Sequence, residues 1–163
     1  MKITSNAIFV FYGQPCSGKS TLAEATKREI YRLSGLSGPI IDGDVIRRIF
    51  KNQDYSKEGR IKNLNRISDI SVYMANYNKL VFVSAVYPYQ ESRHYLENIH
   101  NPVIWVHLIY DGIRGREQYH VKDFDNPLEK DYKYQVEINT SKNEINECTK
   151  KICSFYRQIS DLA

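Results

Sequence analysis

Residues 13–20, Gly13-Gln14-Pro15-Cys16-Ser17-Gly18-Lys19-Ser20, match the pattern G-x-x-x-x-G-K-[ST] at every fixed position. An apolar run at residues 7–12 precedes them, and a helical pattern begins at Ser20. In such a loop the backbone turns its N–H groups toward phosphate oxygens, and the helix N-terminus adds a positive dipole end. The lysine then reaches the terminal phosphates, and the hydroxyl residue ligates Mg²⁺. We therefore predict that a nucleoside triphosphate is held by Gly13, Gln14, Pro15, Cys16, Ser17, Gly18, Lys19, Ser20 and Thr21.

Apolar runs and helical patterns alternate along the rest of the chain. The predicted strands cover residues 7–12, 39–41, 80–85 and 103–110, with a weaker one at 135–138. The predicted helices cover residues 20–33, 45–50, 57–78 and 91–99, and a last one ends near 159. Thr140 or Ser141 is expected to cap this last helix, with Glu144 completing a capping box on Ser141. Uninterrupted apolar strands separated by helices predict a mainly parallel sheet with helices on both faces, a three-layer α/β fold.

Length and composition favour one soluble domain over residues 1–163. The chain has 42% hydrophobic and 26% charged residues and a net charge of +4. This mild positive charge suits a small phosphate-bearing substrate and argues against a nucleic acid polymer as partner. No apolar stretch approaches the ~18–20 residues that span a bilayer, so no membrane partner is expected. Three cysteines without an export signal indicate a reducing cytoplasm.

Two carboxylates follow the short strand at residues 39–41. Asp42 and Asp44 fall at the carboxyl edge of the predicted sheet, where α/β proteins bind their ligands. We predict that Asp42 takes the proton of an acceptor hydroxyl and joins Ser20 near Mg²⁺. Asp44 is a candidate N-cap of the next helix as well as a site residue. A GTPase is not indicated, because Asn78-Lys79 precedes a strand and is not followed by the Asp that reads guanine.

Three further segments carry a resemblance to a known family. Residues 41–47, IDGDVIR, resemble the L-D-G-D-N-[IV]-R signature of adenylylsulfate (APS) kinases, with Val45 in place of Asn. Residues 55–67 resemble the family's F-S…R…N…R stretch, and residues 84–93 its S-x-x-S-P-Y…R segment. Together with the loop at 13–20, the chain from Ile8 to Arg93 is similar to the P-loop kinases of this family.

The resemblance implies transfer of the γ-phosphoryl group of ATP to the ribose 3′-hydroxyl of a nucleotide. Lys19 and Asp42 would be the catalytic pair, Arg47 and Arg60 would grip the anionic part of the acceptor, and Tyr55 would stack on its base. The full set expected at the acceptor is Asp42, Asp44, Arg47, Tyr55, Arg60, Asn63, Ser84, Ala85, Val86, Tyr87 and Lys122. Since relatives are often dimers, a homodimer is consistent with the resemblance.

The polar segment at about residues 114–134 departs from the family. It resembles a lid by position, and Arg114, Arg116 or Lys122 is expected to close over the transferring phosphoryl group and neutralise its charge. It lacks the family's K-G-L-Y-x-x-[AV]-R and F-T-G-[IV]-x-x-P-Y-E-x-P patterns and is shorter. The shorter lid favours a smaller acceptor, and the first hypothesis is cytidine diphosphoramidate, used in capsule phosphoramidate biosynthesis. The alternatives are a true adenylylsulfate kinase of sulfate assimilation, a kinase of another small metabolite, and a non-catalytic ATP-binding regulator.

Overall fold

The computed structural model describes residues 6–112, 115, 117–125 and 132–160. Its centre is a five-stranded sheet in the order β2-β3-β1-β4-β5, and all four neighbouring pairs are parallel. The strands are β1 (Ala7–Tyr12), β2 (Ile40–Asp42), β3 (Leu80–Ser84), β4 (Val103–Ile109) and β5 (Gln135–Asn139). The predicted α/β class and parallel sheet are confirmed.

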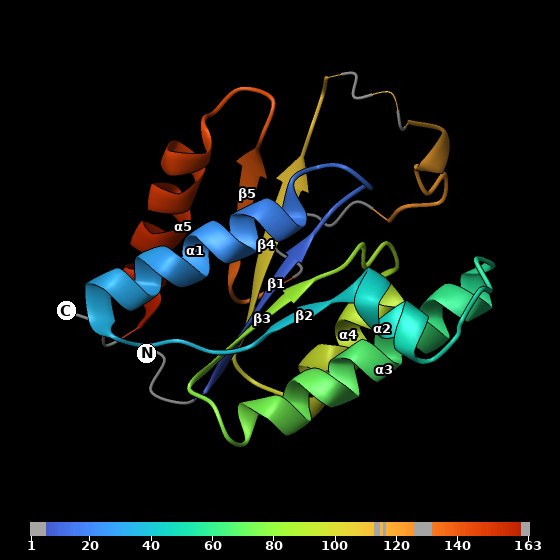
Figure 1. Cartoon of the computed structure of the whole chain (residues 1–163), viewed down its shortest axis with the longest axis horizontal. Helices are drawn as coiled ribbons and strands as arrows, with labels where there is room; N and C mark the ends of the chain where they lie inside the picture. Colours follow the sequence, from blue (N-terminus) through green and yellow to red (C-terminus); the bar gives the residue numbers. More distant parts are fainter. Residues whose placement is uncertain (1–5, 113–114, 116, 126–131, 161–163) are drawn as a thin grey trace.

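Helices cover both faces of this sheet. Figure 1 shows α1 and α5 side by side on one face, while α3 and α4 cover the other. The helices are α1 (Lys19–Ser34), α2 (Gly43–Ile49), α3 (Lys57–Ala75), α4 (Gln90–Ile99) and α5 (Ile145–Ile159), with a short 3₁₀ helix η1 (Glu117–Tyr119). Within the described residues, no helix has the length and apolar character needed to cross a bilayer.

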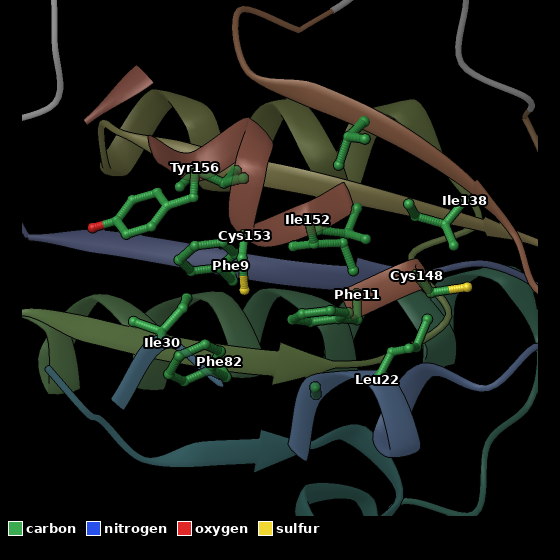
Figure 2. Close-up of a cluster of buried hydrophobic side chains, with 14 of the residues drawn as sticks. Phe9, Phe11, Leu22, Ile30, Phe82, Ile138, Cys148, Ile152, Cys153 and Tyr156 are labelled. Atoms are coloured by element: carbon green, nitrogen blue, oxygen red, sulfur yellow. The ribbon is translucent and has the colours of Figure 1, made fainter. Parts of the chain in front are cut away.

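The central strand β1 is buried along its whole length and separates two hydrophobic cores. Because side chains alternate along a strand, Phe9 and Phe11 face α1 and α5, while Ile8 and Val10 face α3 and α4. Figure 2 shows the first core, where Phe9 stacks on Phe82 and meets the edge of Tyr156. Each such fully buried side chain stabilises the fold by roughly 1.5–3 kcal/mol. The carboxyl ends of the strands are thereby fixed relative to one another.

Two predicted helix ends differ from the structure. The helix expected over 57–78 ends at Ala75, because the Asn78 side chain donates to the carbonyl of Met74 at 2.8 Å and the chain turns toward β3. The last helix begins at Ile145 with Glu144 as its N-cap, and Glu147 accepts the Glu144 N–H at 3.2 Å.

The prediction that Thr140 or Ser141 caps the last helix is wrong, because Glu144 is its N-cap. Thr140 and Ser141 directly follow β5, and their hydroxyl groups bond to residues outside the helix. Thr140 donates to the carbonyl of Ser17 at 2.8 Å, and Ser141 donates to the Asn139 side chain. Thr140 thus belongs to the surroundings of the phosphate-binding loop.

Candidate active site

A cavity of about 1150 Å³ opens at the carboxyl edge of the sheet. The segments that follow β1, β2 and β3 meet there, together with η1, which follows β4 in the sequence. Its lining residues are Pro15, Cys16, Gly18, Lys19, Ser20, Thr21, Asp42, Gly43, Asp44, Arg47, Tyr55, Arg60, Asn63, Leu64, Ile67, Ser84, Ala85, Val86, Pro88, Gln118, Tyr119 and His120. Most of the predicted site residues therefore lie around one hollow.

The loop at residues 13–20 has the backbone of a phosphate cradle. Cys16 has φ 64° and Gly18 has φ 97°, so the chain curls through left-handed conformations before α1 begins. Gly13 passes so close to β4 that a Cβ there would overlap the carbonyl oxygen of Leu108. A side chain at position 13 would push the loop off the sheet, which explains why glycine occupies it.

The Lys19 ammonium lies within this loop. Its Nζ donates to the carbonyl oxygen of Gln14 at 2.8 Å, which holds the side chain folded over the cradle. Burial lowers the pKa of Lys19 to about 8, although Asp44, Cys16 and Asp42 act in the opposite direction. Incoming phosphates would favour the charged form, so the loop is prepared for an anionic ligand.

Three oxygen-bearing side chains meet where α1, β2 and β3 come together. Ser20 Oγ donates to Asp42 Oδ2 at 3.0 Å and lies 2.8 Å from Ser84 Oγ. Asp42 and Ser84 are direct partners in the β2–β3 ladder, which fixes this arrangement in the backbone. Hard oxygen ligands of this kind suit Mg²⁺, which completes its shell with water and substrate phosphates. Ser20 and Asp42 thus fit the expected magnesium site.

Asp42 also begins α2, as its N-cap. Its Oδ1 accepts the backbone N–H groups of Asp44 at 2.9 Å and Val45 at 3.3 Å. The expectation that Asp44 caps this helix is wrong, and the reason is that β2 runs directly into α2 at Gly43. One carboxylate oxygen of Asp42 is held by the helix, and the other is directed toward Ser20.

The side of the cavity opposite the phosphate cradle is built on Tyr55. The Arg47 guanidinium lies 4.4 Å from the centre of the Tyr55 ring, and the Arg60 guanidinium lies 5.5 Å from it. Arg47 also donates to the carbonyl of Asp54 at 2.8 Å, and Arg60 donates to the carbonyl of Tyr55 at 3.0 Å. Tyr55 is 62% exposed, so this cluster of one aromatic ring and two guanidinium groups is accessible to an anionic, ring-bearing ligand.

Asn63 contributes an unsatisfied polar atom to the same wall. The residue is only 3% exposed, and its Oδ1 has no hydrogen-bond partner among the described residues. Leaving such an atom buried and unpaired costs roughly 1–3 kcal/mol. A ligand that donates a hydrogen bond here would remove this cost.

Some predicted residues do not reach the cavity. Tyr87 is fully buried in the core that contains α3, and its hydroxyl lies 3.0 Å from Ser68 Oγ. Lys122 is exposed and is not part of the lining. Gly13, Gln14 and Ser17 belong to the phosphate-binding loop but are not among the residues that line the cavity. Arg114 and Arg116 lie outside the described residues.

Seven lining residues lie outside the set predicted from the sequence, and three of them come from one segment. Gln118, Tyr119 and His120 come from η1 and the residue after it, in the polar segment that lacks periodicity. The same segment is held to the protein by the buried Val121, a contact that its polar composition did not indicate. Pro88 and the apolar Leu64 and Ile67 complete the lining without any chemical signal in the sequence.

The family model described as adenylylsulphate kinase matches residues 5–117 of the chain. The chain belongs to the adenylylsulphate kinase family. Members of this family are ATP-dependent phosphotransferases that act on a hydroxyl group, so the chain is an enzyme of this class. The resemblance found in residues 8–93 is thereby confirmed, and the cavity is the candidate active site of a kinase.

Similar proteins carry the family name. An adenylyl-sulfate kinase of Picosynechococcus sp. is 27% identical over 87% of this chain and 88% of its own length. One of Oceanobacillus iheyensis is 35% identical, over 54% of this chain and 44% of its own length.

Solved structures share the fold of this adenylylsulphate kinase family member. The Mycobacterium tuberculosis APS kinase in complex with AMPPNP and APS has a TM-score of 0.76 at 19% identity, covering 94% of this chain and 98% of that one. A gluconokinase of Sinorhizobium meliloti has a TM-score of 0.66 at 15% identity, covering 99% of this chain and 96% of that one. The likeness to these structures shows the shared fold.

Proposed function

We propose that this enzyme transfers the γ-phosphoryl group of ATP to the ribose 3′-hydroxyl of adenylyl sulfate. The observation that carries the proposal is the hydrogen bond between Ser20 and Asp42, 3.0 Å long, which joins the phosphate-binding loop to the candidate base. The names of the curated relatives support adenylyl sulfate as acceptor in preference to the cytidine compound suggested by the lid.

In the proposed reaction, the loop amides and Lys19 hold the donor phosphates. Mg²⁺, when bound, neutralises the negative charge of the β- and γ-phosphates. The acceptor oxygen forms its bond to the γ-phosphorus while the bond to the β–γ bridging oxygen breaks and ADP leaves. Asp42 Oδ2, the carboxylate oxygen not bonded to the α2 backbone, takes the hydroxyl proton.

The acceptor occupies the wall formed by Tyr55, Arg47 and Arg60. Its base stacks on the Tyr55 ring, and the arginines attract the phosphosulfate. The buried Oδ1 of Asn63 accepts a hydrogen bond from the acceptor, which supplies the donor that this atom lacks. The adenine amino group and the ribose hydroxyls both offer such a donor.

One observation favours testing a second acceptor, cytidine diphosphoramidate. The family match ends at residue 117, and Gln118, Tyr119 and His120, which line the cavity, come directly after it. A wall that departs from the family is consistent with a smaller base, as in cytidine diphosphoramidate.

The test is ADP release from Mg-ATP with no acceptor, adenylyl sulfate, cytidine diphosphoramidate or CDP. We expect turnover with adenylyl sulfate and its loss in Lys19→Ala and Asp42→Asn. Preferential turnover of the cytidine compound would replace adenylyl sulfate as the acceptor. ATP binding without turnover of any acceptor would favour a regulatory protein.

A further inference from the structure

Gln14 stands in the phosphate-binding loop, but its side chain bonds to a distant part of the chain. Its Oε1 accepts the backbone N–H of Val121 at 2.8 Å, and its Nε2 donates to the carbonyl of Val121 at 2.9 Å. Both backbone groups of a buried residue are thus paired with one side chain. The two residues are 107 positions apart in sequence, so no local signal links them.

Val121 opens a short segment, residues 121–125, which we call the strap. Farther along it, the Phe124 ring stacks on His107 at 6.2 Å between ring centres. His107 stacks in turn on Tyr12 at 4.8 Å, and Tyr12 is the residue just before the loop. The strap is therefore joined to the phosphate-binding loop twice, by hydrogen bonds and through a stack of three rings.

The far end of the strap is held by Arg93. This buried guanidinium donates to the carbonyl of Asp125 at 2.8 Å and to the carbonyl of Tyr87 at 2.7 Å. The backbone N–H of Gln90 donates to the Asp125 carboxylate at 3.1 Å. The strap thus connects the phosphate-binding loop to the segment after β3, which also lines the cavity.

The residues just before the strap line the active-site cavity. Gln118, Tyr119 and His120 belong to η1 and its end, drawn in orange beyond the carboxyl ends of the strands in Figure 1. Their position depends on where Val121 is held. We propose that Gln14 is a positioning residue, which holds the strap against the phosphate-binding loop and so fixes residues 118–120 as the wall that selects the acceptor.

This proposal rests on the proposed kinase function and is tested with Gln14→Met, which keeps the size of the side chain and removes both hydrogen bonds. We expect amide hydrogen exchange in residues 117–125 to accelerate at least tenfold, while β1 stays protected. We also expect kcat/KM for the acceptor to fall about tenfold, and the Kd of ATP measured without acceptor to change less than threefold. The matched control is Gln90→Met, since only the backbone N–H of Gln90 reaches the strap and its side chain is exposed.

A double variant separates the strap from a direct effect on phosphate. Phe124→Ala loosens the strap without altering the loop, so Gln14→Met combined with Phe124→Ala should lose less activity than the product of the two single losses. Fully multiplicative losses, unchanged exchange in residues 117–125, or accelerated exchange with unchanged acceptor kinetics would each overturn the proposal. If the wild type phosphorylates none of the acceptors, the proposed function fails, and the exchange and ATP measurements still decide whether Gln14 holds the strap.

Discussion

At the scale of single residues, the site depends on polar atoms whose partners are set by burial. Lys19 is half-buried beside Asp44 and Asp42 without a salt bridge to either within the described residues. Its ammonium instead donates to the carbonyl of Gln14. The Lys19 ammonium is therefore available to pair with an anionic ligand, and its burial lowers its pKa.

We predict that the affinity for ATP falls as the pH rises above 8. The Lys19 amine, with a pKa of about 8, is charged at pH 7 and neutral at pH 9, and only the charged form attracts the phosphates. Fluorescence titration with an ATP analogue at constant Mg²⁺ should show the Kd rising about tenfold between pH 7 and pH 9. Lys19→Met should bind more weakly with a flat profile. An equal slope in this variant would assign the titration to another group.

Thr140 provides a second prediction at this scale. Its hydroxyl donates to the Ser17 carbonyl, and because the peptide is trans, this turns the following Gly18 N–H toward the opposite side, the side of the cradle. Thr140→Val removes the hydroxyl at nearly constant volume, and we expect ATP to bind about fivefold more weakly, which corresponds to about 1 kcal/mol. Thr140→Ser should bind like the wild type. Equal losses in Val and Ser variants would show that the methyl group matters instead.

At the scale of elements, the N-cap residue of α2, Asp42, has both a structural and a chemical role. Asp42 Oδ1 caps the helix, while Oδ2 bonds Ser20. An asparagine side chain keeps an oxygen for the cap but cannot accept a proton as a carboxylate does. The two roles are therefore separable by substitution.

We predict that Asp42→Asn retains stability and loses activity. Its unfolding free energy should stay within about 0.5 kcal/mol of the wild type, while Asp42→Ala should lose about 1 kcal/mol more with the cap. In both variants kcat should fall roughly 10²–10⁴-fold, as expected for removal of a general base. Urea unfolding and ADP release measure the two effects. An active Asp42→Asn would rule out the carboxylate as the base.

The elements also show which features can be predicted from sequence. The buried strands are uninterrupted apolar runs, the long helices repeat apolar residues every three to four positions, and the phosphate-binding loop has a fixed motif. These local signals predicted the elements within a few residues. Tyr87 has a positive φ although it is not a glycine, and its side chain is buried in the core, and no sequence pattern indicates either feature. The strap that follows residues 118–120 is bonded by Gln14 at Val121 and by Arg93 at Asp125, and such long-range contacts leave no periodic trace in the sequence.

At the scale of the whole molecule, the stack of Tyr12, His107 and Phe124 joins the sheet to the strap. His107 is 6% exposed, and Arg93 and Glu137 are the charged groups that act on it, Glu137 from 3.6 Å. Burial, and secondarily Arg93, lowers the pKa of His107 to about 4. The folded protein therefore requires a neutral imidazole at this junction.

We predict a loss of stability in acid that depends on His107. Between pH 6.5 and 4 the unfolded chain binds a proton at this residue and the folded chain does not, so the stability present above pH 6.5 declines as the pH falls, by up to roughly 3 kcal/mol. His107→Gln has no such titration, and thermal unfolding should show a shallower fall of its Tm from pH 6.5 to 4 than in the wild type. Hydrogen exchange at pH 5 should show residues 117–125 opening before β1, because β1, whose Tyr12 also stacks on the ring, is held in addition by both cores. Parallel Tm curves for the two proteins would mean that other groups, the exposed carboxylates among them, carry the acid sensitivity.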